Sequence, residues 1–128
     1  MDIPNKKELF ETGERIAQVH LKSKGYQMLS HNYRRQTGEI DIIARTGNTL
    51  VFVEVKTRSY HSISSALGNV SYPKQKKISK TALLYINSNP DLSNLQTRFD
   101  IIVVFFNAKD NDYSVKHFID AFLPVLDY

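Results

Sequence analysis

Between Gly38 and Lys56 the chain alternates apolar and polar residues in two runs, and the dipeptide Gly47-Asn48 separates the two runs. Alternation with a period of two is typical of strands, and a Gly-Asn pair favours a two-residue hairpin turn. If these two residues form the turn, the register across the hairpin is fixed. The predicted facing pairs are Thr46 and Thr49, Ile43 and Phe52, Asp41 and Glu54, and Glu39 and Lys56.

Alternation also assigns the hairpin residues to two faces. One face is predicted to carry the charged residues Glu39, Asp41, Glu54 and Lys56. The other face is predicted to be core, with Ile40, Ile42, Ala44, Val51, Val53 and Val55. Carboxylates at facing positions repel one another, and a divalent cation would relieve the repulsion. The sequence therefore predicts a metal site on the hairpin, although a solvated face with weak surface ion pairs is the alternative.

The rest of the pattern predicts two helices and three further strands. The expected segments are a helix over 5–24 that a capping box at Asn5 and Glu8 begins, a strand over 26–32, a basic loop over 33–36, a loop over 59–72, a helix that begins at Pro73 and ends at 87–90, a strand over 98–106, a turn over 107–112 and a strand over 113–118. This order predicts one α/β domain over residues 1–128, with a central mixed β-sheet flanked by helices.

Composition and charge exclude some classes of protein. The hydrophobic fraction is 41% and the charged fraction is 23%, as in ordinary folded proteins. The absence of cysteine excludes disulfides and thiolate zinc sites. With neither a secretory signal nor an apolar run long enough to span a membrane, we expect a cytoplasmic protein. The net charge of +4 is compatible with a nucleic-acid partner.

Oxygen ligands on the predicted hairpin suit Mg²⁺ or Mn²⁺, which proteins usually hold through one or two carboxylates and waters. Asp41 and Glu54 would supply the carboxylates, and the carbonyl of Val55 a third oxygen. Lys56 would share their face, where its ammonium could orient an attacking water or balance charge on a phosphate. These parts favour phosphodiester cleavage. No nucleophile–base pair or cofactor loop favours acyl transfer or redox chemistry.

Two further polar residues fall on predicted apolar helix faces. Glu14 lies in line with Phe10, Ala17 and Leu21, and a carboxylate at the edge of a core needs a partner such as a metal ion. The alternative is a surface carboxylate near Arg15 or Lys22. Gln75 lies in line with the apolar stripe Ile78, Ala82, Tyr85 and Ile86. It would bind a metal-bound water or a phosphate, or else only flank a helix boundary.

The chain resembles the YraN-like family of uncharacterised proteins and, through it, the restriction-endonuclease-like (PD-(D/E)xK) nucleases, which include archaeal Holliday junction resolvases. The segments that carry the resemblance are Gly13-Glu14, Asn32-Tyr33-Arg34, Gly38-Glu39-Ile40-Asp41, Phe52 to Arg58 and Arg98-Phe99-Asp100. The resemblance implies a restriction-endonuclease-like core. It also implies metal-binding and catalytic roles for Glu14, Asp41, Glu54 and Lys56, with Gln75 as an accessory. In this superfamily Pro often precedes the first Asp, where this chain has Ile40.

Basic residues near these motifs are candidates for contacts with nucleic-acid phosphates. The candidates are Arg34, Arg35, Arg58, Lys74, Lys76, Lys77 and Lys80, each of which could equally lie on a solvated face. Arg98 and Asp100 are expected to form a structural pair. The histidines His20, His31, His61 and His117 show no metal-ligand spacing.

Together these features predict a nuclease that depends on Mg²⁺ or Mn²⁺ and cleaves DNA, including branched or structured DNA. Two other hypotheses stay open: a DNA-binding module of the same fold without activity, and an RNA nuclease. A homodimer is a further hypothesis, because junction resolvases act as dimers and residues 118–123 are apolar enough to pack against a partner. The same segment would otherwise fold back on its own core.

Overall fold

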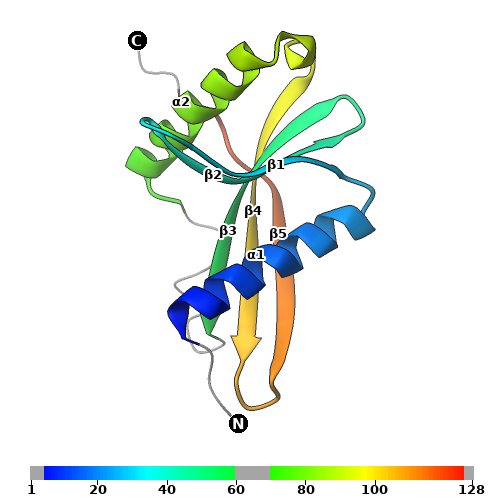
Figure 1. The fold of residues 1–128 in the computed structure, drawn as a ribbon, viewed down its shortest axis with the longest axis vertical. Coiled ribbons are helices and arrows are strands. Elements are labelled where there is room, and N and C mark those ends of the chain that lie inside the picture. Colours follow the sequence, from blue (N-terminus) through cyan, green and yellow to red (C-terminus); the bar gives the residue numbers. More distant parts are fainter. Residues whose placement is uncertain (1–4, 60–69, 126–128) are drawn as a thin grey trace.

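The computed structural model describes residues 5–59 and 70–125, and within them two helices flank one five-stranded sheet (Figure 1). The elements in chain order are α1 (Lys6–Ser23), β1 (Gln27–Arg35), β2 (Gly38–Thr46), β3 (Thr49–Ser59), α2 (Tyr72–Ser88), a short 3₁₀ helix η2 (Pro90–Leu92), β4 (Gln96–Asn107) and β5 (Asp112–Phe122). The strands lie in the order β1-β2-β3-β4-β5, and β3 and β4 are the parallel pair in an otherwise antiparallel sheet. The predicted α/β architecture with a mixed sheet is confirmed.

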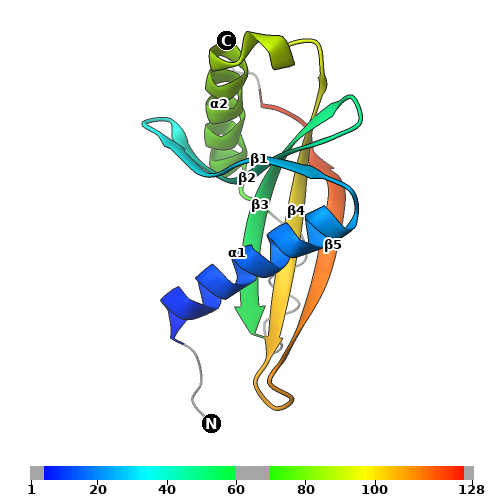
Figure 2. The ribbon, with the colours of Figure 1, turned by 45° about the vertical axis from the view of Figure 1, so that its right-hand side comes forward.

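The sheet separates two apolar clusters, one under each helix. Ala17 and Leu21 of α1 pack with Ile42, Val53 and other residues of β2, β3 and β4. The cluster under α2 contains Ile43, Phe52, Ile78, Ala82, Tyr85 and Phe99. Figures 1 and 2 show α1 crossing β3, β4 and β5, whereas α2 lies beside the other end of the sheet. The two helices therefore pack on different parts of the sheet, each over its own apolar cluster.

Local sequence signals explain where both helices begin. The side chain of Asn5 accepts a hydrogen bond from the backbone N–H of Glu8 at 2.8 Å, as the capping box predicts. Ser71 caps α2, and Pro73 lies in its first turn, where a missing N–H leaves no hydrogen bond unmade. The ends of α2 match the prediction to within two residues.

Several sequence expectations differ from the structure. β1 continues to Arg35, so the predicted basic loop at 33–36 is mostly strand. Phe10 is exposed, although it was assigned to the apolar face of α1. Residues 60–69 of the predicted loop, His61 among them, lie outside the described residues. The strand predicted over 113–118 continues to Phe122.

The late apolar segment packs on its own core. Phe118, Ala121 and Phe122 contact the cluster under α2, whereas Ile119 and Leu123 are exposed. The fold-back alternative is therefore observed for three of its side chains. Within residues 5–59 and 70–125, no helix is long and apolar enough to span a membrane.

α1 approaches β3 closely at Gly13. A Cβ atom at this position would collide with Oγ1 of Thr57, whose side chain is β-branched and stiff. Glycine thus lets the helix lie directly on the strand, one residue before the buried Glu14. This contact fixes the height of Glu14 above the sheet.

We predict that Gly13→Ala destabilises the protein by about 1–3 kcal/mol, because overpacking outweighs the better helix propensity of alanine. The free energy of unfolding in urea measures the effect. Gly13→Ala should cost less in a Thr57→Ala background, where the colliding hydroxyl is gone. A Gly13→Ala variant as stable as the parent would contradict the close approach.

Candidate functional site: a fork between two strands

The candidate site lies where β2 and β3 separate, just beyond the pair Ile42 and Val53, and we call this place the fork. The hairpin has the predicted register from Thr46 and Thr49 down to Ile42 and Val53, and the pairing ends there. The next residue of β2 is Asp41, and its Oδ2 accepts a hydrogen bond from the backbone N–H of Val55 at 2.7 Å. A side-chain carboxylate has thus taken the place of a backbone acceptor, and beyond it the two strands diverge (Figure 1).

The same point interrupts the alternation of β2. Ile40 was predicted to share a face with Ile42, but it lies in the cluster under α2, together with Ile43. This prediction is wrong, and the reason is local. Asn32 lies between His31 and Tyr33, which pair with Ile42 and Ile40, and has a φ of +51°, a left-handed conformation that interrupts a regular strand. The break turns Ile40 towards α2.

Asp41 and Glu54 line one cavity of about 120 Å³ at this fork. Its other lining residues are Gly38, Glu39, Lys74, Lys77 and Ile78, so β2, β3 and α2 each form one wall. A water molecule occupies roughly 30 Å³ in the liquid. The cavity therefore has room for a cation with several of its waters or for a phosphate group.

Burial and negative charge act together on the carboxyls of the fork. Burial and then the charge of Glu54 raise the pKa of Asp41 to about 8, although the hydrogen bond from Val55 opposes the shift. Burial also raises the pKa of Glu14, against hydrogen bonds with the side chains of Asp41 and Asn32. Two carboxyls in hydrogen-bonding contact need a proton or a cation between them. The surface position considered for Glu14 is wrong, because this side chain is buried against the fork.

Two lysines near Glu54, Lys74 and Lys56, are arranged differently. Lys74 forms an ion pair with Glu54, with 2.7 Å between Nζ and Oε1. Lys56 follows two residues after Glu54 on β3 and is half-buried. Burial lowers the pKa of the Lys56 ammonium, and the charge of Arg58 adds to the shift while that of Glu54 opposes it. A lysine of lowered pKa gives up its proton more readily than an ordinary surface lysine.

Mg²⁺ or Mn²⁺ fits the donors at the fork in three respects. The donor atoms are oxygens, which these ions prefer. Oε2 of Glu14 is buried without a hydrogen-bond partner, so an acceptor at the site is left unused. The N–H of Val55 points to Asp41, and in a strand the carbonyl of the same residue points to the same side. This carbonyl is therefore directed so that it could supply a further oxygen ligand.

The described residues do not form a ready-made metal cage. Among them, no group of three His, Asp or Glu side chains is arranged as a metal cluster. Mg²⁺ commonly needs only one or two protein carboxylates because it keeps several waters. Asp41 and Glu54 meet that lower requirement.

Other predicted site residues have structural partners. Nε2 of Gln75 donates to the carbonyl of Val70 at 2.8 Å, so this amide holds the start of α2. Glu39 pairs with Arg34 at 3.1 Å instead of facing Lys56. The guanidinium of Arg35 lies over the ring of Tyr33, 4.1 Å from its centroid.

The basic candidates lie on three elements, β1, β3 and α2. Arg34 and Arg35 are exposed at the end of β1, and Lys74 and Lys77 line the cavity from α2. Arg58 is exposed beyond Lys56 on β3, and its guanidinium donates to the carbonyl of Thr57. Lys76 is half-buried and Lys80 is exposed, and neither is among the residues that line the cavity.

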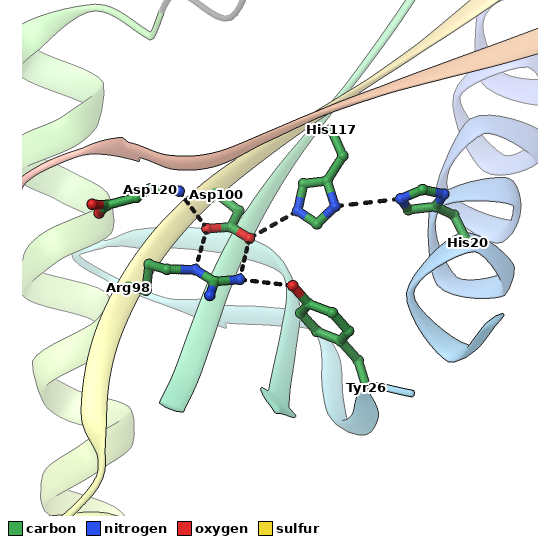
Figure 3. Close-up of polar contacts among 6 residues, drawn as sticks. All are labelled: His20, Tyr26, Arg98, Asp100, His117 and Asp120. Atoms are coloured by element: carbon green, nitrogen blue, oxygen red, sulfur yellow. Dashed lines mark hydrogen bonds and ion pairs between the residues drawn. The ribbon is translucent and has the colours of Figure 1, made fainter. Parts of the chain in front are cut away.

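The sequence analysis missed a second polar cluster, which is centred on Asp100 of β4 (Figure 3). Asp100 is fully buried, and Arg98 donates to both of its carboxylate oxygens at 2.8 Å, as the expected pair requires. Nε2 of His117 lies 2.8 Å from the same carboxylate, and the backbone N–H of Asp120 donates to it at 2.9 Å. Burial would raise the pKa of Asp100, but these hydrogen bonds outweigh burial and hold the pKa below its ordinary value.

This cluster ties α1 to the sheet. Nδ1 of His117 lies 3.3 Å from Nε2 of His20 on α1, and Arg98 also donates to the hydroxyl of Tyr26 (Figure 3). Burial lowers the pKa of His20, and the neighbouring His117 and Lys24 add to the shift. Since His20 and Glu14 belong to the same helix, the cluster helps to fix how α1 presents Glu14 to the fork. The sequence carries only a weak signal for this cluster, because residues 20, 100 and 117 are far apart along the chain.

We predict that the metal-free protein becomes less stable as the pH rises. The folded protein keeps the Asp41 proton to about pH 8, whereas the unfolded chain loses it near pH 4. The free energy of unfolding should therefore fall from about pH 5 to about pH 8, by at most ~1.4 kcal/mol per pH unit. Asp41→Asn should flatten this dependence, and the exposed control Glu11→Gln should not. Equal slopes in Asp41→Asn and the parent would refute the assignment.

A second prediction concerns the Asp100 cluster. Asp100→Ala should lower the free energy of unfolding by about 3–5 kcal/mol, because it leaves the half-buried guanidinium of Arg98, His117 and the N–H of Asp120 without their acceptor. Thermal or chemical denaturation measures the loss, and Asp91→Ala on the exposed η2 is the control. A loss no larger than that of the control would show that the cluster does not hold the fold together.

Comparison with known proteins identifies the family. The model of the uncharacterised protein family UPF0102 matches residues 13–104. A UPF0102 protein of Clostridium botulinum (strain Loch Maree) is 42% identical over 116 residues, which cover 91% of this chain and 94% of the relative. A UPF0102 protein of Chlorobium limicola is 42% identical over 118 residues, which cover 86% of this chain and 88% of the relative. The chain therefore belongs to the UPF0102 family, which confirms the resemblance to YraN-like proteins.

Proposed function

We propose that this UPF0102 protein is a metal-dependent nuclease of the restriction-endonuclease-like superfamily, which hydrolyses phosphodiester bonds in DNA. The observation that supports this most strongly is the pair of buried carboxylates, Asp41 and Glu54, on the walls of one cavity. Lys56 follows two residues later on the same strand. These three residues match the metal-binding and catalytic positions of the superfamily in identity and order.

The chain's own residues would divide the work as follows. Asp41, Glu54 and the carbonyl of Val55 would hold Mg²⁺ or Mn²⁺, and Glu14 would support the site from α1. When bound, the ion would supply Lewis-acid assistance to the phosphoryl group and lower the pKa of a coordinated water. Nζ of Lys56 would orient the attacking water and accept its proton, for which a lowered pKa suits it.

Basic residues on both sides of the fork would hold the DNA backbone. Arg34 and Arg35 extend from the end of β1, and Lys77 lies on the cavity wall formed by α2. Contacts of this kind position a phosphate without reading the sequence. The similarity to archaeal Holliday junction resolvases favours branched DNA as the substrate. A homodimer, with the exposed Ile119 and Leu123 as candidates for its contact surface, would place two forks on one junction.

The second candidate function is a DNA-binding module that cleaves nothing. The ion pair between Lys74 and Glu54 favours it, because it engages one of the two carboxylates in the described structure. Such a module would bind DNA with an affinity that falls steeply with salt, and it would give no product at any metal concentration.

We predict cleavage that requires Mg²⁺ or Mn²⁺. The assay incubates the pure protein with linear, flapped, single-stranded and four-way DNA, together with RNA of matched sequence. Asp41→Asn and Lys56→Ala should each lower the cleavage rate at least about a hundredfold, because each removes a group that acts in the transition state. Glu11→Gln, on the exposed face of α1, is the control.

The same assay separates the candidate functions. Cleavage of RNA in preference to DNA would favour the RNA nuclease. Binding without any product would favour the silent module. If Asp41→Asn and Lys56→Ala cut as fast as the parent, the activity would not belong to this fork.

A further inference from the structure

We propose that Lys74 is a tethered counterion of the metal site: its ammonium neutralises Glu54 before the divalent cation binds, leaves Glu54 when the cation arrives, and then contacts a phosphate of the DNA. This inference rests on the proposed function, because it takes Glu54 as a metal ligand. It adds a residue whose position links the occupancy of the metal site to the binding of DNA.

The contact between Lys74 and Glu54 occupies one of the two carboxylate oxygens that could bind the metal ion. Nζ of Lys74 lies 2.7 Å from Oε1 of Glu54, whose side chain is only 8% exposed. Mg²⁺ binds its oxygen ligands at about 2.1 Å. A divalent cation on Oε1 would therefore lie within about 5 Å of the ammonium if Lys74 stayed in place. Two cations this close on one carboxylate repel one another strongly, so binding of the metal ion displaces the lysine.

Lys74 is free to move once its ion pair breaks. Its side chain is 53% exposed and belongs to the first turn of α2, and four flexible carbons separate the ammonium from the backbone. The backbone itself stays fixed, because Ser71 caps the N–H of Lys74. The side chain can thus turn from the cavity to solvent without any change in the helix.

The position of Lys74 suggests where the ammonium goes. It lies on the cavity wall beside Lys77, and a phosphate held near the metal ion is the nearest anion that a bound DNA would bring. In the metal-free protein the ammonium is engaged with Glu54. Metal binding then makes one more cation available for DNA, so the two ligands bind with positive coupling.

The first experiment measures Mn²⁺ binding by calorimetry without DNA. Lys74→Gln should bind Mn²⁺ about fivefold or more tightly than the parent, because the competing cation is gone. Lys74→Arg, which keeps the charge, should bind like the parent. Lys77→Gln removes the same charge from the same cavity wall, and it should change the affinity less than twofold if pairing with Glu54 is what matters.

The second experiment needs no metal ion. Glu54→Gln frees Lys74, so this variant should bind a DNA duplex more tightly than the parent, beyond the effect of removing one negative charge. The gain should vanish in a Lys74→Gln background and persist in a Lys77→Gln background, which has the same net charge. A gain of equal size in both backgrounds would overturn the proposal.

The outcomes distinguish this inference from the proposed function. If the parent binds Mn²⁺ and Lys74→Gln binds it no more tightly, the counterion role is wrong and the metal site stands. If Lys74→Gln and Lys77→Gln tighten Mn²⁺ binding equally, only general electrostatics is at work and the inference falls. If neither the parent nor Lys74→Gln binds Mn²⁺, the metal site and the inference fail together.

Discussion

The hydrogen bond from the N–H of Val55 to Asp41 is the contact on which the rest of the site depends. It ends the pairing of β2 with β3 and leaves a three-walled cavity that α2 closes. The same bond fixes the buried carboxylate of Asp41 next to Glu14 and near Glu54. Burial and the charge of Glu54 oppose the charged form of Asp41, and burial opposes that of Glu14, so the arrangement costs stability. The divalent cation that we propose for the fork would offset this cost.

The two helices contribute to the fork in different ways. α1 brings Glu14 to it, and the close contact of Gly13 with Thr57 and the cluster around Asp100 hold that helix on the sheet. α2 supplies two cations, with Lys74 on Glu54 and Lys77 on the same wall. These two lysines therefore lie in a different layer from the carboxyls of the fork, whereas Lys56 lies in the sheet, two residues after Glu54. An electrostatic change in one layer, such as the loss of a lysine from α2, can alter the site without disturbing the anchoring of α1.

Much of this arrangement was predictable because it depends on local rules. The Gly47-Asn48 turn and the period of two fixed the hairpin register as far as Ile42 and Val53. The prediction failed for Ile40, because alternation cannot foresee the left-handed Asn32 or a side chain that replaces a backbone acceptor. The partners of Lys74 and His117 could not be predicted from the sequence, for another reason. They depend on where α2 packs on the sheet and on how β5 pairs with β4, and no residue spacing encodes that geometry.

The most direct measurement is a crystal structure of the protein soaked in Mn²⁺, with data collected at a wavelength where manganese scatters anomalously. A metal site at the fork predicts an anomalous peak in the cavity, with oxygen ligands from Asp41, Glu54 and the carbonyl of Val55 at roughly 2.0–2.3 Å. A crystal soaked at a saturating concentration of Mn²⁺ that shows no peak in the cavity, or Mn²⁺ bound only at other residues, would contradict the metal site. In that case the buried carboxylates would need a structural explanation.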